Sequence, residues 1–262
     1  MVILERLPGK IKESKMDKKM KNGLVLLKDG SCDFGKIVEN LKKEWDITVE
    51  TQEKDGVLSF NVGNNIVLLS LVKSKVSDEV AESVTRNLFW EHGKSEVSGH
   101  NAYVKIEIDG GKDAIKVAKL FVKIASAVLS LENAIGIYTG VTILGSEMYK
   151  EVANELKDDD LPLLNLVYFG FYQTDNGICG YTQGLDFFDK KEIEVVDTDV
   201  EFGDLFDFMV DVANYVITSD VKLGDGETIG FTAEQKLPIT LSEGVSVEGM
   251  SLKIGLNKEN IK

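Results

Sequence analysis

The stretch from Ser98 to Ile108 reads Ser-Gly-His-Asn-Ala-Tyr-Val-Lys-Ile-Glu-Ile and organises the prediction of the fold. From Ala102 onward, apolar residues alternate with polar ones, which is typical of a strand with one buried face. His100, one of two histidines in the chain, stands at the start of this strand, and αβ patterns lie on either side of it. We therefore predict a strand that closes one αβ module and leads into the next.

The elements upstream of this strand, together with the strand itself, follow the order β-α-β-β-α-β. Strands are predicted at 23–28, 56–62 and 66–72, and helices after the N-caps Asp33 and Ser77. Gly and Asn at 63–65 suit a hairpin turn, because both tolerate positive φ. This order is that of a ferredoxin-like module, with two helices on one face of an antiparallel sheet.

A second round of similar elements follows. The apolar periodicity predicts a long helix over 112–131, broad enough to be buried between layers. The remaining expectations are strands at 134–139, 164–173, 192–197 and 237–241, helices at 146–156 and 205–217, and a last edge strand between 245 and 256.

The predicted fold class is therefore α+β, with two ferredoxin-like (βαββαβ-type) modules packed into one compact unit. The sheets are expected to be mostly antiparallel, with helices on one face. The expected boundaries are a basic N-terminal arm at 1–22, a first module at 23–110, and a second at 111–262 that includes the long linking helix and the C-terminal strands.

The chain is strongly acidic. Its 262 residues include 30 basic and 44 acidic ones, for a net charge of -14. Such a surface repels phosphate groups, so we expect neither nucleic acid nor an anionic membrane as a main partner. Two explanations of this negative charge remain open: it keeps the protein soluble, or it attracts a basic protein partner. The arm at 1–22 carries +4, and is either solvated or folded back on the acidic body.

Two cysteines, Cys32 and Cys179, lie far apart and outside any CxxC pair, which is typical of free thiols in a cytosolic protein. Lysines interrupt the longest apolar stretch, at 114–131, which therefore indicates a buried helix and no membrane span. The first residues lack the apolar core of a signal peptide. We expect a cytoplasmic protein without a metal or other cofactor, and the sequence leaves the oligomeric state open.

Named catalytic motifs are missing from the sequence, so no catalytic residue is assigned. There is no GxxxxGK[ST], HExxH or GxSxG pattern, and the glycines at 224, 226 and 230 have the wrong spacing for a dinucleotide loop. A loose polar set remains at His100, Glu192, Glu194, Asp225 and Glu227. If these groups converged, they could bind a cation or ligand or transfer protons. The alternative is that they cap turns and stabilise the fold.

Several motifs together resemble an uncharacterised bacterial family, the domain of unknown function number 4261. They are Gly23-Leu-Val-Leu-Leu, Asn87 with Trp90, Gly99-His100-x-Ala102, Gly136-x-Tyr138, Gly184-Leu185 with Glu192-x-Glu194, and Asp225-Gly-Glu-Thr-Ile-Gly230. The resemblance covers most of the chain from Gly23 onward. It implies a soluble bacterial protein and no particular activity. Tyr138 stands in one of these motifs, and Thr228 belongs to the same polar turn as Asp225 and Glu227, so both are also candidate ligand-binding residues.

Three functions remain open. The first is a non-enzymatic, immunity-like or adaptor-like module that binds a basic protein. The second is an enzyme or a small-ligand or cation-binding protein that uses the cluster around His100. The third is a scaffold that self-associates through a late edge strand.

Overall fold

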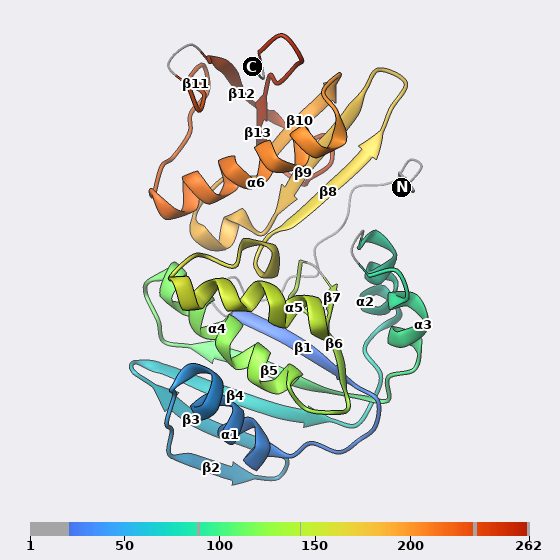
Figure 1. The fold of residues 1–262 in the computed structure, drawn as a ribbon, viewed down its shortest axis with the longest axis vertical. Coiled ribbons are helices and arrows are strands. Elements are labelled where there is room, and N and C mark those ends of the chain that lie inside the picture. Colours follow the sequence, from blue (N-terminus) through green and yellow to red (C-terminus); the bar gives the residue numbers. More distant parts are fainter. Residues whose placement is uncertain (1–20, 88–89, 142, 233–234, 261–262) are drawn as a thin grey trace. The chain divides into compact units, whose positions relative to one another are not determined.

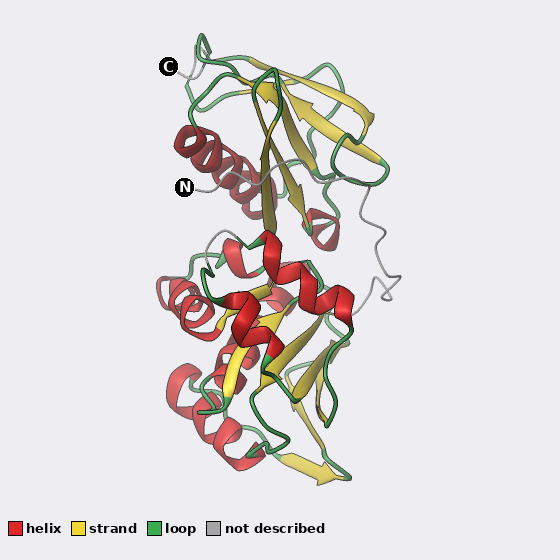
Figure 2. Ribbon diagram, turned by 90° about the vertical axis from the view of Figure 1, so that its right-hand side faces the viewer, coloured by secondary structure: helices red, strands yellow, loops and turns green. Residues whose placement is uncertain are grey.

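The computed structural model describes residues 21–87, 90–141, 143–232 and 235–260. The arm predicted at 1–22 lies almost entirely outside the described residues. The described chain divides into two compact units, at 21–166 and 167–260. Each unit combines helices with its own sheet, as the labels in Figure 1 and the colours in Figure 2 show, and all but one pair of neighbouring strands are antiparallel. The α+β class is therefore confirmed.

The first unit is built on a sheet with the order β2-β3-β4-β5-β1-β6-β7, in which all neighbours are antiparallel. The central strand β1 lies between β5 and β6, and Val25, Leu26 and Leu27 are fully buried in it. The bounds of the strands are β1 Lys21–Leu27, β2 Thr51–Lys54, β3 Val57–Val62, β4 Asn65–Val72, β5 Ala102–Asp109, β6 Ala134–Tyr138 and β7 Ile143–Gly145.

Helices cover both faces of this sheet. The long helix α4 packs against β1, with the Phe121 ring against Gly23, and contacts α1 and α5. Side chains alternate along a strand, so Leu24 and Leu26 point to the opposite face, where they meet α2 and α3. The bounds are α1 Phe34–Trp45, α2 Asp78–Glu82, η1 Ser83–Arg86, α3 Gly93–Ser98, α4 Ala114–Leu129, α5 Ser146–Ala153, η2 Asn154–Asp158 and η3 Leu163–Asn165.

The ferredoxin-like part of the prediction is not confirmed in this unit. In a split βαβ arrangement, the strands joined by a helix are parallel and have another strand between them. Here β4 and β5, which the α2–α3 segment joins, are adjacent and antiparallel. The chain also forms β2 and β7, which were not expected, and its helices cover two faces instead of one.

The region before β5 also differs from the prediction. The helix expected after Ser77 breaks into α2 and η1, and a separate short helix, α3, occupies Gly93–Ser98. The strand then begins only at Ala102. His100 therefore lies in the link between α3 and β5, and not within a strand.

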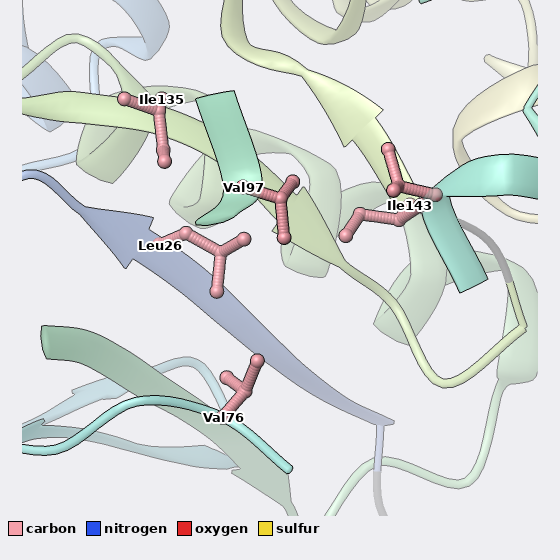
Figure 3. Close-up of a cluster of buried hydrophobic side chains, with 6 residues drawn as sticks. Leu26, Val76, Val97, Ile135 and Ile143 are labelled. Carbon is pink, nitrogen blue, oxygen red and sulfur yellow. The ribbon is translucent and has the colours of Figure 1, made fainter. Parts of the chain in front are cut away.

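The α2–α3 segment is held by a compact apolar cluster (Figure 3). Trp90 lies against this cluster, and its ring covers the backbone at Gly136 and Gly145. A Cβ atom at Gly136 would come within 2.5 Å of that ring. The packing explains why glycine is needed opposite this tryptophan. The buried cluster consists of Leu26, Val76, Val84, Val97, Ile135 and Ile143.

The second unit has a sheet of order β11-β12-β13-β10-β9-β8, in which β10 and β13 are parallel. Helix α6 packs against β9 through its buried face, and its Phe202 and Phe206 contact Phe171 of β8. The bounds are β8 Tyr168–Gln173, β9 Ile178–Gln183, η4 Leu185–Phe188, β10 Ile193–Thr198, α6 Phe202–Thr218, β11 Thr228–Ile229, β12 Leu237–Glu243 and β13 Met250–Ile254.

Two expectations for the C-terminal half are corrected. The last strand, β13, was expected at an edge, but it lies between β12 and β10 and is internal. A ferredoxin-like second module is likewise not confirmed. One long helix, α6, packs against this sheet in the described part of the chain, and the sheet contains β9, which was not expected. The described chain divides into its two units at 166/167, and α4 belongs to the first unit because it packs on β1.

Candidate functional site

The seven candidate residues fall into both units. His100 and Tyr138 belong to the first unit, and the other five belong to the second. Each group is described within its own unit.

His100 links two backbone segments around the cluster of Figure 3. Its Nε2 accepts a hydrogen bond of 2.8 Å from the backbone N–H of Val76, and its Nδ1 contacts the carbonyl oxygen of Val97. These contacts fit a neutral ring with the proton on Nδ1. His100 is only 2% exposed, and the side chains of Val76 and Val97 both belong to the cluster. Both ring nitrogens are thus used by the fold, and proton transfer to a ligand would require one of these contacts to break.

Tyr138 ends β6 and donates a hydrogen bond of 3.0 Å to the carbonyl oxygen of Gly140. Gly140 has a φ of 92°, a conformation that favours glycine. The tyrosine ring also packs against the cluster of Figure 3. These contacts give Tyr138 a local structural role at the turn after β6.

Glu192 binds the turn at the start of η4. Its carboxylate accepts hydrogen bonds from the hydroxyl of Thr182 at 2.6 Å and from the backbone N–H groups of Gly184, Leu185 and Asp186 at 2.8, 3.0 and 3.4 Å. Burial raises the pKa of Glu192 to about 7, although the hydrogen bonds from Thr182 and Gly184 act in the opposite direction. The side chain therefore titrates near neutral pH while it holds the turn.

Glu194 is fully buried and fastens the β12–β13 hairpin to β10. Its carboxylate accepts hydrogen bonds from the backbone N–H groups of Val245 and Ser246, the latter at 2.6 Å, and from the Ser251 hydroxyl. Lys253 Nζ lies 2.9 Å from Oε2 and also donates to Ser251 Oγ at 2.7 Å. A buried carboxylate with this many donors is well compensated.

The surroundings of Glu194 act on its pKa in both directions. Burial by itself would raise the pKa, but the hydrogen bonds from Ser251, Ser246 and Lys253 hold it below the usual value. The carboxylate is therefore ionised at neutral pH. Its negative charge is neutralised by Lys253 and by backbone dipoles.

Asp225, Glu227 and Thr228 form the turn that leads into β11. The Asp225 carboxylate accepts a hydrogen bond of 2.7 Å from the backbone N–H of Leu241, and Glu227 Oε2 accepts one of 2.8 Å from Gly224. Thr228 begins β11 with an exposed side chain. Both carboxylates thus satisfy backbone donors of the turn and of the neighbouring β12.

Sequence reasoning missed several polar residues that accompany Glu194. Ser251 and Lys253 lie two apart on one strand and so share a face, which the sequence could have indicated. The parallel register that places Lys253 opposite Glu194 has no local sequence signal. Tyr172 joins the hairpin by a hydrogen bond of 3.0 Å between its hydroxyl and that of Ser246, and burial raises the pKa of Tyr172 to about 12.

The buried thiol of Cys179 lies opposite Tyr172 across the β8–β9 pair. Its sulfur accepts a hydrogen bond of 3.2 Å from the backbone N–H of Asp197 and contacts the Asp197 carboxylate at 3.5 Å. Burial raises the pKa of the Cys179 thiol. The thiolate form is disfavoured, so this cysteine is a weak nucleophile.

The groups around Glu194 are thus satisfied by one another and by the backbone. Their arrangement explains how the loop at 244–249 is held to the sheet. Over the described ranges, no group of three His, Cys, Asp or Glu side chains could hold a metal ion. In the same part of the chain, no helix is both long and apolar enough to cross a membrane.

Comparison with known protein families gives a match to part of the chain. Residues 181–255 match a family described as Domain of unknown function (DUF4261), which confirms the resemblance over this range. The matched range contains Glu192, Glu194, Asp225, Glu227 and Thr228, and it excludes His100 and Tyr138. No curated protein and no solved structure matches the chain.

Proposed function

We propose that this chain is a non-enzymatic protein-binding module that takes a basic protein partner on the outer face of α6. The observation that carries the proposal is an exposed acidic stripe formed by Asp204, Asp207 and Asp211. These residues recur every three or four positions along α6, so they project from one side of the helix. We call them the α6 acidic stripe.

The α6 acidic stripe ends in an aromatic residue. Tyr215 follows Asp211 by four positions, so it lies on the same side of the helix, and it is 42% exposed. Asp207 and Asp211 form no ion pair with any of the described residues. Exposed tyrosine beside unneutralised carboxylates suits a partner that presents lysine or arginine near an apolar surface.

The charge of the whole second unit supports the same partner class. Residues 167–262 hold 18 acidic and 7 basic residues, a net charge of -11. A field of this sign speeds encounter with a basic protein and repels nucleic acid. The immunity-like or adaptor-like role expected from the sequence is a concrete form of this proposal.

The contacts of the candidate residues support a non-enzymatic role. Both nitrogens of His100 contact backbone groups, and Glu192, Glu194, Asp225 and Glu227 all accept backbone hydrogen bonds. A cytoplasmic location is part of the same proposal, and the free thiols Cys32 and Cys179 support it.

The test compares two variants that remove the same number of charges. In the first, Asp204, Asp207 and Asp211 are each replaced by Asn. In the second, the control, Glu151→Gln, Asp158→Asn and Asp160→Asn remove three exposed charges from the first unit. Binding of a labelled oligolysine peptide is measured for both, and each protein is also used to capture partners from its native host at low salt.

We expect the α6 variant to lose the basic partner and to bind the peptide more weakly, while the control resembles the wild type. High salt should weaken binding to the wild type, because exposed charges are screened. Equal binding by both variants, or recovery of no basic protein by the wild type, would overturn the proposal.

A further inference from the structure

Two Asn-Gly pairs occur in the chain, at Asn22-Gly23 and Asn176-Gly177. In such a pair the backbone nitrogen of the second residue can attack the side-chain amide of the asparagine, because glycine has no Cβ to hinder the approach. The fold decides how readily each pair can react. This chemistry involves neither α6 nor the partner proposed for it.

The first pair, Asn22-Gly23, lies inside a sheet. Both residues belong to β1, where they stand opposite Glu107 and Ile106 of β5. Gly23 is also buried, with the Phe121 ring packed against it. Attack by the Gly23 nitrogen requires the central strand of the first unit to open, which is costly in a folded sheet.

The second pair, Asn176-Gly177, lies in the turn that joins β8 to β9 (Figure 1). The ladder between these strands ends with Gln173 opposite Ile178, so the pair is outside it. Asn176 is exposed to solvent. Its side chain can therefore meet the nitrogen of Gly177 without breaking the sheet.

The hydroxyl of Thr174 contacts the nitrogen that has to react. Thr174 Oγ1 accepts hydrogen bonds from the backbone N–H of Gly177 at 3.2 Å and from that of Asn176 at 3.1 Å. The same hydroxyl donates to the Asp197 carboxylate at 2.6 Å. It also lies 3.1 Å from the carbonyl oxygen of Gly177, but the shorter contact with the carboxylate is the stronger one. A path for a proton thus runs from the Gly177 nitrogen through Thr174 to Asp197.

We propose that this turn deamidates itself at Asn176, with Asp197 receiving the proton through Thr174. The Gly177 N–H gives its proton to the Thr174 hydroxyl, whose own proton passes to Asp197. The nitrogen forms a bond to Cγ of Asn176, the bond from Cγ to Nδ2 breaks, and ammonia leaves with the proton that Asp197 held. Water then opens the five-membered succinimide ring, which leaves aspartate or isoaspartate at position 176. Water is the only co-reactant, and nothing is oxidised or reduced.

The reaction changes both the charge and the backbone of the turn. It adds one carboxylate to a unit whose net charge is already -11. Isoaspartate also lengthens the main chain by one carbon next to Gly177, where even a Cβ atom would come within 2.4 Å of the carbonyl oxygen of Thr198. The modified turn therefore loses its close fit against the end of β10.

The first test follows both asparagines in the same full-length protein. The purified chain is incubated at neutral pH over weeks, and peptide mass spectrometry measures how much of Asn22 and of Asn176 has been converted. Methyl transfer by an isoaspartyl methyltransferase confirms isoaspartate at position 176. We expect conversion of Asn176 to be at least about tenfold faster than that of Asn22 in the folded protein, and the two rates to become similar in urea.

Two variants that each remove one charge test the role of Asp197. Asp197→Asn keeps an oxygen that accepts from Thr174 but removes the base, and asparagine tolerates the φ of 52° at this position. Asp175→Asn is the matched control, because it removes the carboxylate next to Asn176, which the proton path does not use. We expect conversion of Asn176 to be at least about tenfold slower in Asp197→Asn and close to the wild-type rate in the control.

The pH dependence of the rate separates a base from a group that only shapes the turn. When the Asp197 carboxylate takes the proton, the rate should change little between about pH 6 and 8, whereas a reaction that depends on hydroxide accelerates about tenfold per pH unit. The Cys179 thiol on β9 also contacts this carboxylate, at 3.5 Å, and burial raises the pKa of the thiol, so it stays protonated over this range. We expect a flat profile in the wild type and a steep one in Asp197→Asn.

Three results would overturn the proposal. The first is conversion of Asn176 no faster than that of Asn22 in the folded wild type. The second is an equal rate in Asp197→Asn and Asp175→Asn. The third is a steep pH profile in the wild type itself, which needs no altered protein and so does not depend on how the variants fold.

Discussion

Lys253 Nζ lies 2.9 Å from Oε2 of Glu194, and both side chains are largely buried, at 18% and 1% exposure. The two residues stand opposite each other on the parallel strands β10 and β13. Glu194 also accepts the backbone N–H groups of Val245 and Ser246. This ion pair therefore joins the middle of the sheet to the loop of the last hairpin.

We expect Glu194→Ala to lower the free energy of unfolding by about 3 to 5 kcal/mol, because it leaves the charge of Lys253 buried without its partner. Replacing both residues by Met should cost less than the single change. Urea unfolding measures both effects. The exposed pair Lys150–Glu147 is the control, and Glu147→Ala should cost less than about 1 kcal/mol. Similar losses for Glu194→Ala and Glu147→Ala would contradict the assigned role.

A second prediction concerns the two histidines. His100→Ala should lower the free energy of unfolding by about 2 to 3 kcal/mol, because the N–H of Val76 and the carbonyl of Val97 lose a buried partner. His92 is exposed, so His92→Ala should change it by less than about 0.5 kcal/mol. Thermal and urea unfolding of both variants provide the comparison. A stable His100→Ala protein would show that the ring is not needed by the fold.

The third prediction is a pH dependence from Glu192. Its pKa is about 7 in the folded protein and near the ordinary glutamate value of 4.5 when unfolded, so the folded state binds more protons between these values. The stabilisation is complete below about pH 4.5 and is lost as pH rises through about 7, by up to about 3 kcal/mol.

Glu192→Gln removes this titration, so the difference in free energy of unfolding between wild type and variant should vary over this pH range and become constant above it. Urea unfolding at closely spaced pH values measures the difference. A pH-independent difference from pH 4.5 to 7 would contradict the raised pKa.

The fourth prediction compares two glycines of the second unit. A Cβ atom at Gly170 would come within 2.2 Å of the Tyr181 ring, whereas one at Gly203 in α6 would meet nothing within 4 Å. Gly170→Ala should lower the free energy of unfolding by about 1 to 3 kcal/mol, since the ring must move. Gly203→Ala should raise it by about 0.5 kcal/mol, because alanine favours the helix. Calorimetric unfolding measures both changes. A larger loss of stability in Gly203→Ala than in Gly170→Ala would contradict the close packing of Gly170 against Tyr181.

Local signals in the sequence determined much of the secondary structure. Asp33 caps α1 as predicted, with its side chain accepting from the N–H of Lys36. The turn at 63–65 joins β3 to β4, and Gly63 has the expected positive φ of 57°. Caps, turns and helical periodicity depend on residues close together in the chain, so they can be recognised without the fold.

Tertiary structure alone decided which strands pair and which polar groups are buried. β13 became an internal strand because it pairs with β10 and β12, and this choice placed Lys253 beside a carboxylate 59 positions earlier in the chain. His100 has a structural role because α3 lies just before it in the chain and places the carbonyl oxygen of Val97 within reach of the ring. These outcomes depend on the packing of distant segments, whose combined free energy no short stretch of sequence encodes.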